Sequence, residues 1–386
     1  MRSRKIIYSR NWGGRSIKRD AHYYAILAFC QACGFKKEAA YQVAYASQFV
    51  DDAKVNHIVL KENTHLEHDR IDNKPSFFNM ATCHSYFRIK TFNYEAMINN
   101  TTAFHFVPGC KGENFSRKLR CAKESPVILD LLQEVLQKDD LIKLGIVLHV
   151  YADSYSHQGF SGILSKVNDI KECKVKTKGL PVFFDRVIQL LKRLDRNRYE
   201  AFFDSAVPAY GHGQALDYPD CPYLTWSYQY DYSDEFRGSY KRVEINNPKR
   251  YKQAFTKIQK HLKAYLENHP QYRDTEIGFQ DFDILMDALV AKTTDGSRER
   301  NWRKLLMAQG LFGIGDLDWI TYDDTRWLRE AFANFEAKKF HERKVEEVEL
   351  ADGFANSHWY RFYLAVKWYK SRFFQYCTKY QLVIPR

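Results

Sequence analysis

Three ionisable residues share one face of a strongly apolar segment in the middle of the chain. In LHVYADSYSHQGF, His149, Asp153 and His157 follow one another at intervals of four residues. Such intervals place side chains on the same face of an α-helix. The outer two are separated by about 12 Å of helical rise, too far for one ion to bind all three. The spacing therefore suggests two metal ions that share Asp153, with a set of hydrogen-bonded core side chains as the alternative.

Further His and Asp residues in compact, apolar or Gly/Pro contexts extend this candidate site. They are Asp20, His22, Asp51, Asp52, His84, His105, His212, Asp217 and Asp220. Imidazole nitrogen and carboxylate oxygen suit zinc, and a catalytic zinc site keeps one position open for water. Each residue also has a structural alternative as a helix cap, a turn residue, a solvated charge or a core side chain.

No other catalytic motif competes with this set. The sequence contains no GxxxxGK[ST], no GxGxxG after a strand, no HExxH and no GxSxG. Cys30 and Cys33 form a CxxC, but it lies in a helical pattern without a βαβ context. The eight cysteines are therefore expected to be free thiols.

The elements expected to position these residues are helices. With 18 Gly and 10 Pro in 386 residues, the chain lacks the regular turns of an all-β sandwich, and we predict an all-α fold. The first two predicted helices are joined by a very short turn and must be antiparallel, which brings Asp51 and Asp52 to the level of His22. Helical patterns cover residues 22–33, 37–52, 139–160, 181–194, 251–268, 282–291, 302–311, 327–337 and 359–376.

The chain is predicted to have three parts. Residues 1–19 form a basic N-terminal extension, residues 20–235 a helical metal-binding catalytic core, and residues 236–386 a helical part packed on that core. Residues 208–234 are rich in Gly, Pro, Tyr and Asp, which predicts a long aromatic loop. The apolar stripe between Trp359 and Tyr376 indicates a core-docking helix face, with a helix lying on an anionic membrane as the alternative.

The charge balance favours polyanionic partners. Lys and Arg number 59 against 47 Asp and Glu, a formal net charge of +12. Nucleic acid, an anionic membrane or a phosphate-bearing substrate would all suit this charge. The basic amino terminus has no apolar core region, and no segment approaches 18 consecutive apolar residues. We therefore expect neither a classical signal peptide nor a spanning helix, and no obligate protein partner is evident.

Five sequence blocks, in order, resemble a bacterial group of zinc metallophospholipases C that includes effectors delivered into host cells. They are HYYAILAFCQACGF, AYASQFVDD, FHFVPG, HVYADSYSHQGFSG and GHGQALDYPDCPYLTW, spanning roughly residues 20–230. This group is part of the all-helical superfamily of zinc-dependent phospholipases C and single-strand nucleases. The resemblance implies a multi-helix bundle with long loops around two or three zinc ions. It also implies that the protein acts in the bacterial cytoplasm or is delivered into a host cell by a secretion system.

The resemblance also implies a distribution of ligands. The first zinc would be bound by Asp51, by His84 or His105, and by His149 and Asp153. His22 would bind a neighbouring ion that Asp153 also reaches. The remaining pocket would contain His157, His212 and either Asp220 or Asp217. Secreted members of the superfamily use a processed N-terminal Trp as a ligand, and Asp20 is the candidate substitute here.

The predicted function is phosphodiester hydrolysis, in which zinc supplies a hydroxide nucleophile and neutralises charge on the phosphoryl oxygens. Asp51, Asp52 and Asp153 are the predicted catalytic carboxylates, and Asp51 or Asp52 would orient or deprotonate the water. A phospholipase C that cleaves phosphatidylcholine-like lipids to diacylglycerol and phosphocholine is favoured. The segment after His212 is aromatic and poor in Lys and Arg, which suits a lipid. A zinc-dependent single-strand nuclease is the alternative, and a noncatalytic helical protein with structural zinc is a third interpretation.

Overall fold

The computed structural model describes residues 19–53, 55, 57–78, 94–177, 209–276, 281–293, 295–341 and 345–385. The α-helices in these ranges are α2 (Ile26–Ala32), α3 (Lys37–Asp52), α4 (Tyr94–Ala96), α5 (Ala103–His105), α6 (Phe115–Lys118), α7 (Pro126–Val135), α8 (Leu141–Ser156), α11 (Asn247–Asn268), α12 (Phe282–Val290), α13 (Asp295–Ala308), α14 (Arg326–Ala331), α15 (Ala337–His341) and α16 (His358–Lys379). Two π-helical segments are η1 (Asp20–Ala25) and η3 (Met97–Thr102). Short 3-10 helices are η4 (Lys166–Asn168), η5 (Gly213–Ala215), η6 (Tyr218–Asp220), η7 (Pro270–Tyr272), η8 (Ile314–Asp316) and η9 (Phe354–Asn356).

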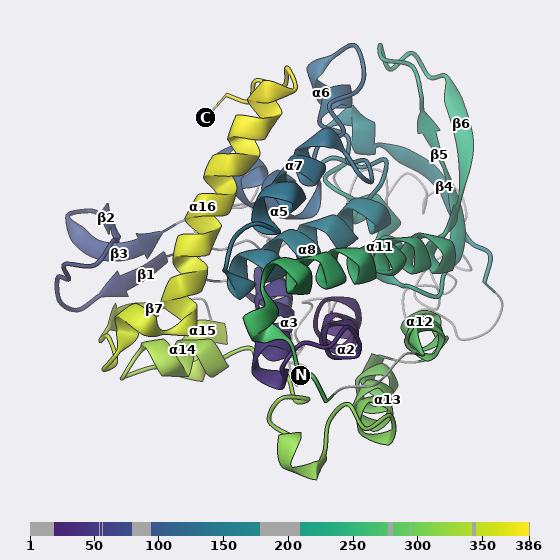
Figure 1. Cartoon of the computed structure of the whole chain (residues 1–386). Coiled ribbons are helices and arrows are strands. Elements are labelled where there is room, and N and C mark those ends of the chain that lie inside the picture. The colour runs from purple at the N-terminus through teal and green to yellow at the C-terminus, as the bar shows by residue number, and fades with distance from the viewer. Residues whose placement is uncertain are drawn as a thin grey trace, which may run out of the picture.

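Helix α8 lies at the centre of the helical part, and α3, α7, α11 and α16 all pack against it (Figure 1). All residues of α8 except the half-buried Lys143 are buried, which agrees with its almost wholly apolar sequence. The side chain of Asp140 caps it by accepting hydrogen bonds from the backbone N–H groups of Ile142 and Lys143. The prediction of a central buried helix is confirmed, with its end at Ser156.

The contact between α3 and α8 is close because of one glycine. A Cβ atom at Gly145 would lie 2.4 Å from the carbonyl oxygen of Val43 and 2.7 Å from the Cβ of Ala46. The absence of a side chain therefore lets the two helices approach. Since Gly145 precedes His149 by about one turn, this approach brings the end of α3 towards the polar face of α8. The predicted antiparallel pairing of α2 and α3 also holds, and it places Asp51 next to His22.

The prediction of an all-α fold is wrong, because the described residues contain two β-sheets in addition to the helices. The strands are β1 (His57–Leu60), β2 (Asp69–Ile71), β3 (Lys74–Phe78), β4 (Ile170–Val175), β5 (Thr225–Asp231), β6 (Tyr240–Asn246) and β7 (Val345–Val348). One sheet has the order β2-β3-β1-β7 and the other the order β4-β5-β6. Strands β1 and β7 pair in parallel, and the other pairs are antiparallel. The fold is therefore mixed α and β, with the sheets at the two sides of the helices (Figure 1).

Strand β5 shows why the strands were missed. It lies at the end of the segment predicted to be an aromatic loop, and its sequence TWSYQYD alternates aromatic and polar residues with the period of a strand. The Gly, Pro and Asp residues that precede it dominate the local composition and hide this alternation. Strand β7 is found only by its pairing with β1, far away in sequence, which no local pattern reports.

The C-terminal helix α16 docks on the core, as the first of the two interpretations predicts. Its apolar stripe is buried, and the side chains of Phe362, Tyr363, Tyr369 and Phe373 are fully covered. In the part of the chain that the structure describes, no helix is long and apolar enough to cross a membrane. The helices that follow residue 235 contact the N-terminal ones, since α11 and α16 pack on α8 and α13 packs on η1. The three-part division of the chain stays a prediction.

Candidate metal centre

Five buried His and Asp side chains gather between η1, α3, α5 and α8. His22 lies on η1, Asp51 in the last turn of α3, His105 at the end of α5, and His149 and Asp153 on α8. Ligand atoms of His22, Asp51 and His149 lie within 4.8 Å of one another, and so do those of His105, His149 and Asp153. We call these five residues the first His/Asp group. Its size and chemistry are those of a site that could hold a metal ion.

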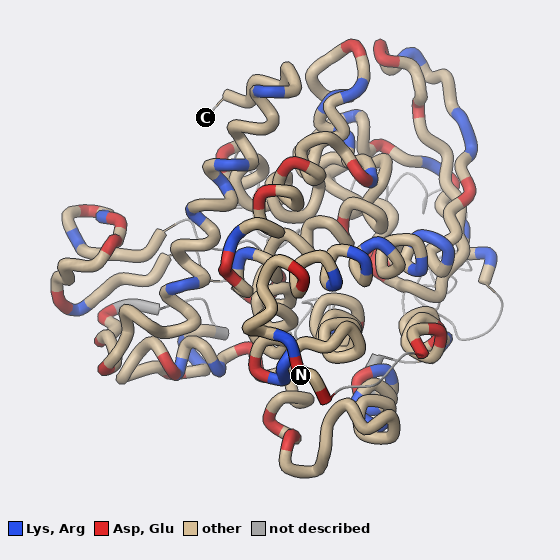
Figure 2. The backbone as a smooth tube through the Cα atoms, viewed as in Figure 1, with Lys and Arg blue, Asp and Glu red and all other residues tan. Residues whose placement is uncertain are grey.

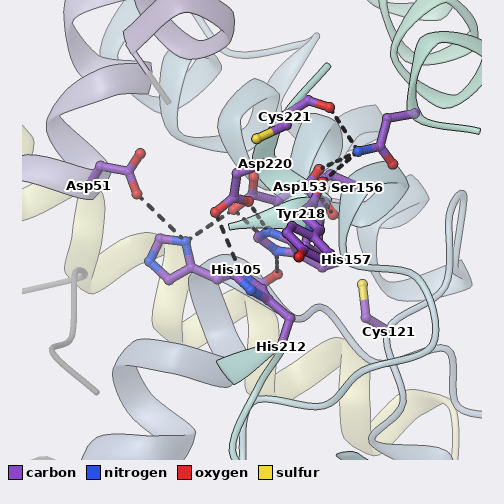
Figure 3. A network of polar contacts seen from close by, with 12 residues as sticks. Asp51, His105, Cys121, Asp153, Ser156, His157, His212, Tyr218, Asp220 and Cys221 are labelled. Atoms are coloured by element: carbon purple, nitrogen blue, oxygen red, sulfur yellow. Dashed lines mark hydrogen bonds and ion pairs between the residues drawn. The ribbon is translucent and has the colours of Figure 1, made fainter. Parts of the chain in front are cut away.

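Asp153 has histidines at both of its carboxylate oxygens. Its Oδ1 is 3.1 Å from Nε2 of His22, and its Oδ2 is 3.0 Å from Nδ1 of His105. Oδ2 also lies 3.3 Å from Nε2 of His149 and 3.7 Å from Nδ1 of His157. Figure 3 shows Asp51 and His105 at one side of this cluster and His157 at the other. Asp153 is thus the point at which the side chains from several elements meet.

A second His/Asp group consists of His157, His212 and Asp220. His157 follows the last residue of α8, His212 precedes η5, and Asp220 ends η6. Nε2 of His157 is 2.8 Å from Oδ1 of Asp220, and Nε2 of His212 is 3.6 Å from Oδ2 of the same carboxylate. These three residues also offer ligand atoms within 4.8 Å of one another.

Backbone carbonyls orient both histidines of the second group. The Nδ1–H of His157 donates to the carbonyl oxygen of His105 at 2.7 Å, and that of His212 donates to the carbonyl oxygen of Leu216 at 2.6 Å. Since a carbonyl oxygen only accepts, Nδ1 carries the proton in both rings. Nε2 of each ring then faces an oxygen of Asp220. A ring nitrogen without a proton would repel this carboxylate, so either a proton on Nε2 or a bound cation must lie between the two. Metal-binding histidines commonly show this bond from the second ring nitrogen.

The pKa values of His149 and Asp153 suit metal binding, whereas the pKa of His157 is shifted in the opposite direction. Burial, followed by the neighbouring His22, lowers the pKa of His149 to about 4, so that its ring is neutral at pH 7. Burial alone would raise the pKa of Asp153, but the nearby histidines, first of them His157, hold it well below its usual range. Burial opposes the charge on His157, yet Asp153 and Asp220 raise its pKa. Neutral imidazole and ionised carboxylate are the forms that bind a metal, so His149 and Asp153 favour an ion, and an ion at His157 would have to displace the proton that its raised pKa favours.

Two buried ring nitrogens of the first group, Nδ1 of His22 and Nδ1 of His149, show whether an ion suits this group. The rings of His22 and His149 lie 3.9 Å apart between centroids. Among the described residues, no hydrogen-bond partner reaches Nδ1 of either ring. A buried polar atom without a partner costs free energy, which a bound cation or an ordered water would recover. The donor set of the first group therefore fits a metal ion.

Asp20, a predicted ligand, lies outside both groups. Its carboxylate accepts hydrogen bonds from the guanidinium of Arg298, whose Nε is 2.9 Å from Oδ2, and from the indole N–H of Trp302. It does not cap the helix either, since it is the first residue of η1. No local pattern in the sequence points to Arg298 or Trp302, because they lie on α13, 278 and 282 residues from Asp20.

The structure also decides between some of the alternative ligands. Asp52 is buried next to Asp51, but its Oδ2 accepts hydrogen bonds from Nε2 of Gln48 at 3.1 Å and from the hydroxyl of Tyr322 at 2.9 Å. Of the alternatives Asp217 and Asp220, it is Asp220 that contacts His157. His84 lies outside the described residues, whereas the other mid-chain histidine, His105, belongs to the first group.

The aromatic residues after His212 do not form an exposed rim. Tyr218, Leu224, Trp226 and Tyr228 are buried, with no more than 5% of each exposed. They pack into the core from η6, from β5 and from the turn between them, while Tyr232 at the end of the segment is exposed. The composition of this segment suits a lipid, but Tyr218, Leu224, Trp226 and Tyr228 do not offer a lipid an open surface.

Comparison with known proteins gives a family but no function. No curated protein and no solved structure matches the chain. One family model, described as a family of unknown function (DUF6765), matches residues 17–377, and this range contains all eight residues of the two His/Asp groups. Because the match covers nearly the whole chain, the protein belongs to this family of unknown function, DUF6765.

Proposed function

We propose that the protein is a zinc-dependent phosphodiester hydrolase whose ions bind the two His/Asp groups. The observation that carries the proposal is the position of Asp153. Its carboxylate lies 3.0 to 3.3 Å from three histidines of the first group and 3.7 Å from His157 of the second. A carboxylate in that position can link ions in adjacent sites, and closely spaced ions are a common means of cleaving phosphate esters.

Zinc is proposed because of the ligand set. Five histidines and three aspartates make up the two groups. Imidazole-rich sets of this kind suit zinc, whereas calcium and magnesium prefer sites made of oxygen ligands alone. Two orphan ring nitrogens in the first group and two carbonyl-anchored histidines in the second support the choice.

The chain would contribute orientation and proton transfer. Zinc ions bound at these groups would activate water near neutral pH and neutralise charge on the phosphoryl oxygens. Asp51 is the better candidate than Asp52 to orient or deprotonate that water, because Oδ2 of Asp52 already accepts hydrogen bonds from Gln48 and Tyr322. The low pKa of Asp153 keeps that carboxylate ionised to hold the ions.

The proposed substrate is a phosphatidylcholine-like lipid, and support for this choice comes from the sequence resemblance. Trp226 and Tyr228 of β5 are buried, so they do not offer a lipid an exposed aromatic surface. Several lysines lie along α11 (Figure 2), most of them exposed, and they would suit the alternative, a nucleic-acid strand. Part of that charge is balanced, since Lys252 pairs with Asp287 and Lys257 with Glu124. The place of action, the bacterial cytoplasm or a host cell, stays a prediction of the resemblance.

The purified protein is expected to hold two or three zinc ions per chain, since the two groups occupy different parts of the cluster. Elemental analysis after dialysis against buffered zinc measures this number. His149→Ala should lower the count, and His358→Ala, on the surface at the start of α16, should leave it unchanged. A protein that holds no metal after zinc has been supplied would falsify the proposal.

Chelator-sensitive release of phosphocholine from phosphatidylcholine vesicles is the expected activity, with little cleavage of single-stranded DNA. The assay compares untreated protein, protein treated with a zinc chelator, and treated protein to which zinc has been returned. Faster cleavage of DNA or RNA than of any phospholipid would replace the lipase by the nuclease. Bound zinc without hydrolysis of either substrate would support the noncatalytic interpretation.

A further inference from the structure

The segment that carries Asp220 is too short to fix its own position. Helix η6 is a single 3-10 turn of three residues, and one of them is Pro219, which has no backbone N–H to donate. Asp220 is nevertheless placed within 2.8 Å of His157. Contacts from elsewhere in the molecule must therefore hold this turn.

Asn247, the first residue of α11, makes these contacts. Its side chain is fully buried, and its Nδ2 donates to the carbonyl oxygens of Tyr218 at 2.6 Å and of Cys221 at 2.8 Å. Tyr218 and Cys221, which lie on either side of Asp220 in the sequence, are both seen near it in Figure 3. The amide thus binds the turn before and after the carboxylate residue.

Two neighbours complete the arrangement. The indole N–H of Trp226 donates to Oδ1 of Asn247 at 3.3 Å. Because an indole can only donate, this bond fixes the orientation of the amide with its NH₂ towards the turn. One helical turn later, the hydroxyl of Tyr251 donates to the carbonyl oxygen of Pro219 at 3.3 Å. Asn247 and Tyr251, near the start of α11, therefore bind the three carbonyls of residues 218, 219 and 221.

We propose that Asn247 is a positioning residue for the second His/Asp group, holding Asp220 where its two oxygens face Nε2 of His157 and of His212. The inference rests on the proposed metal binding, but it concerns the affinity for the ion and not hydrolysis. Residues that orient metal ligands typically change metal affinity by about 10- to 100-fold when they are replaced.

Asn247→Asp tests the inference with almost no change in shape. Aspartate keeps an acceptor for Trp226 but puts an oxygen in place of the amide nitrogen, facing two carbonyl oxygens. Metal-free protein is titrated with Zn²⁺ in a calorimeter, and His212→Ala identifies the binding step that belongs to the second group. In Asn247→Asp we expect this same step to weaken by about 10- to 100-fold, while the other steps stay within about twofold.

Asn246→Ala is the matched control. Asn246 is the exposed neighbour of Asn247 and caps α11 by accepting the backbone N–H of Lys249 at 2.9 Å, so its loss perturbs the same helix start without touching the Asp220 turn. Unchanged zinc affinity in Asn247→Asp, or an equal loss in Asn246→Ala, would overturn the positioning role. A wild-type protein that binds no Zn²⁺ would instead overturn the proposed function. Asn247→Ser, which keeps one donor, replaces Asn247→Asp if circular dichroism shows that the latter is unfolded.

Discussion

Replacement of Asp153 with asparagine is expected to reduce phosphodiester hydrolysis by about a thousandfold and to release bound zinc, with little change in the fold. The carboxylate lies 3.0 Å from His105 and 3.1 Å from His22, so losing its charge affects every ion that these residues hold. Ions of this kind supply several kcal/mol of transition-state stabilisation, and about 4 kcal/mol corresponds to three factors of ten in rate. Initial rates, zinc content and the circular dichroism spectrum are measured on the same preparation.

His358→Ala is the control for this replacement. His358 lies at the start of α16, pairs with Glu330 at 2.9 Å and stacks on Trp327, outside both His/Asp groups. Its loss should leave the rate of hydrolysis unchanged. If Asp153→Asn retains full activity, or if His358→Ala loses most of it, the site has been placed wrongly. If Asp153→Asn is inactive because it is unfolded, the metal has a structural role.

The part of the site that local patterns describe could be predicted from the sequence. The four-residue spacing on α8 indicates a shared face for His149 and Asp153, and the short turn after α2 places Asp51 beside His22. Both inferences depend only on helix geometry. His157 is a partial exception, because α8 ends at Ser156 and the histidine lies just beyond it, held by the carbonyl oxygen of His105.

The features of the fold and the site that could not be predicted from the sequence depend on contacts between segments that are far apart in the chain. Strand β7 pairs with β1, which precedes it by more than 280 residues, and this pairing helps make the fold mixed α and β. Asn247 has no signal beyond the start of a helix, yet it holds the turn of Asp220. Asp20 has the residue type and the neighbourhood of a ligand, and only the structure shows the cation that its carboxylate faces. Residue type and spacing predict which chemistry a side chain can perform, but they do not predict which distant side chain it contacts in the fold.

The ion pair between Asp20 and Arg298 joins the start of the described chain to α13. Both side chains are almost completely buried, with 0% and 2% of their surfaces exposed. Arg298 also donates to the carbonyl oxygens of Leu289, at 2.5 Å, and of Ala291. Trp302 lies one turn further along α13 and donates to the other oxygen of Asp20. This network thus connects η1, which carries His22, with the end of α12 and with α13.

Arg298→Met is expected to lower the free energy of unfolding by about 3 to 5 kcal/mol, the usual effect of removing one partner of a buried ion pair. Methionine fills much of the same space, but it removes the cation from the buried Asp20 and the donors from two carbonyls. Urea unfolding, followed by circular dichroism, measures the change as a lower midpoint with an unchanged slope. Arg300→Met, on the exposed side of the same helix, should change this free energy by no more than about 0.5 kcal/mol.

A double replacement separates the loss of the pair from the loss of packing. If the cost arises because the carboxylate of Asp20 has lost its cation, then Asp20→Leu combined with Arg298→Met should be more stable than Arg298→Met alone, since hydrophobic pairs often replace buried ions at little cost. If the stability losses of Asp20→Leu and Arg298→Met simply add in the double variant, the destabilisation by Arg298→Met arises instead from the carbonyls of Leu289 and Ala291, which have lost their donors. A stability of Arg298→Met equal to that of Arg300→Met would mean that the pair contributes nothing.

Asp20 precedes His22 by two residues on η1, so this ion pair is expected to help hold the first His/Asp group. Unfolding measured with saturating zinc tests this. If the pair has this role, the bound ions stabilise the wild type more than they stabilise Arg298→Met.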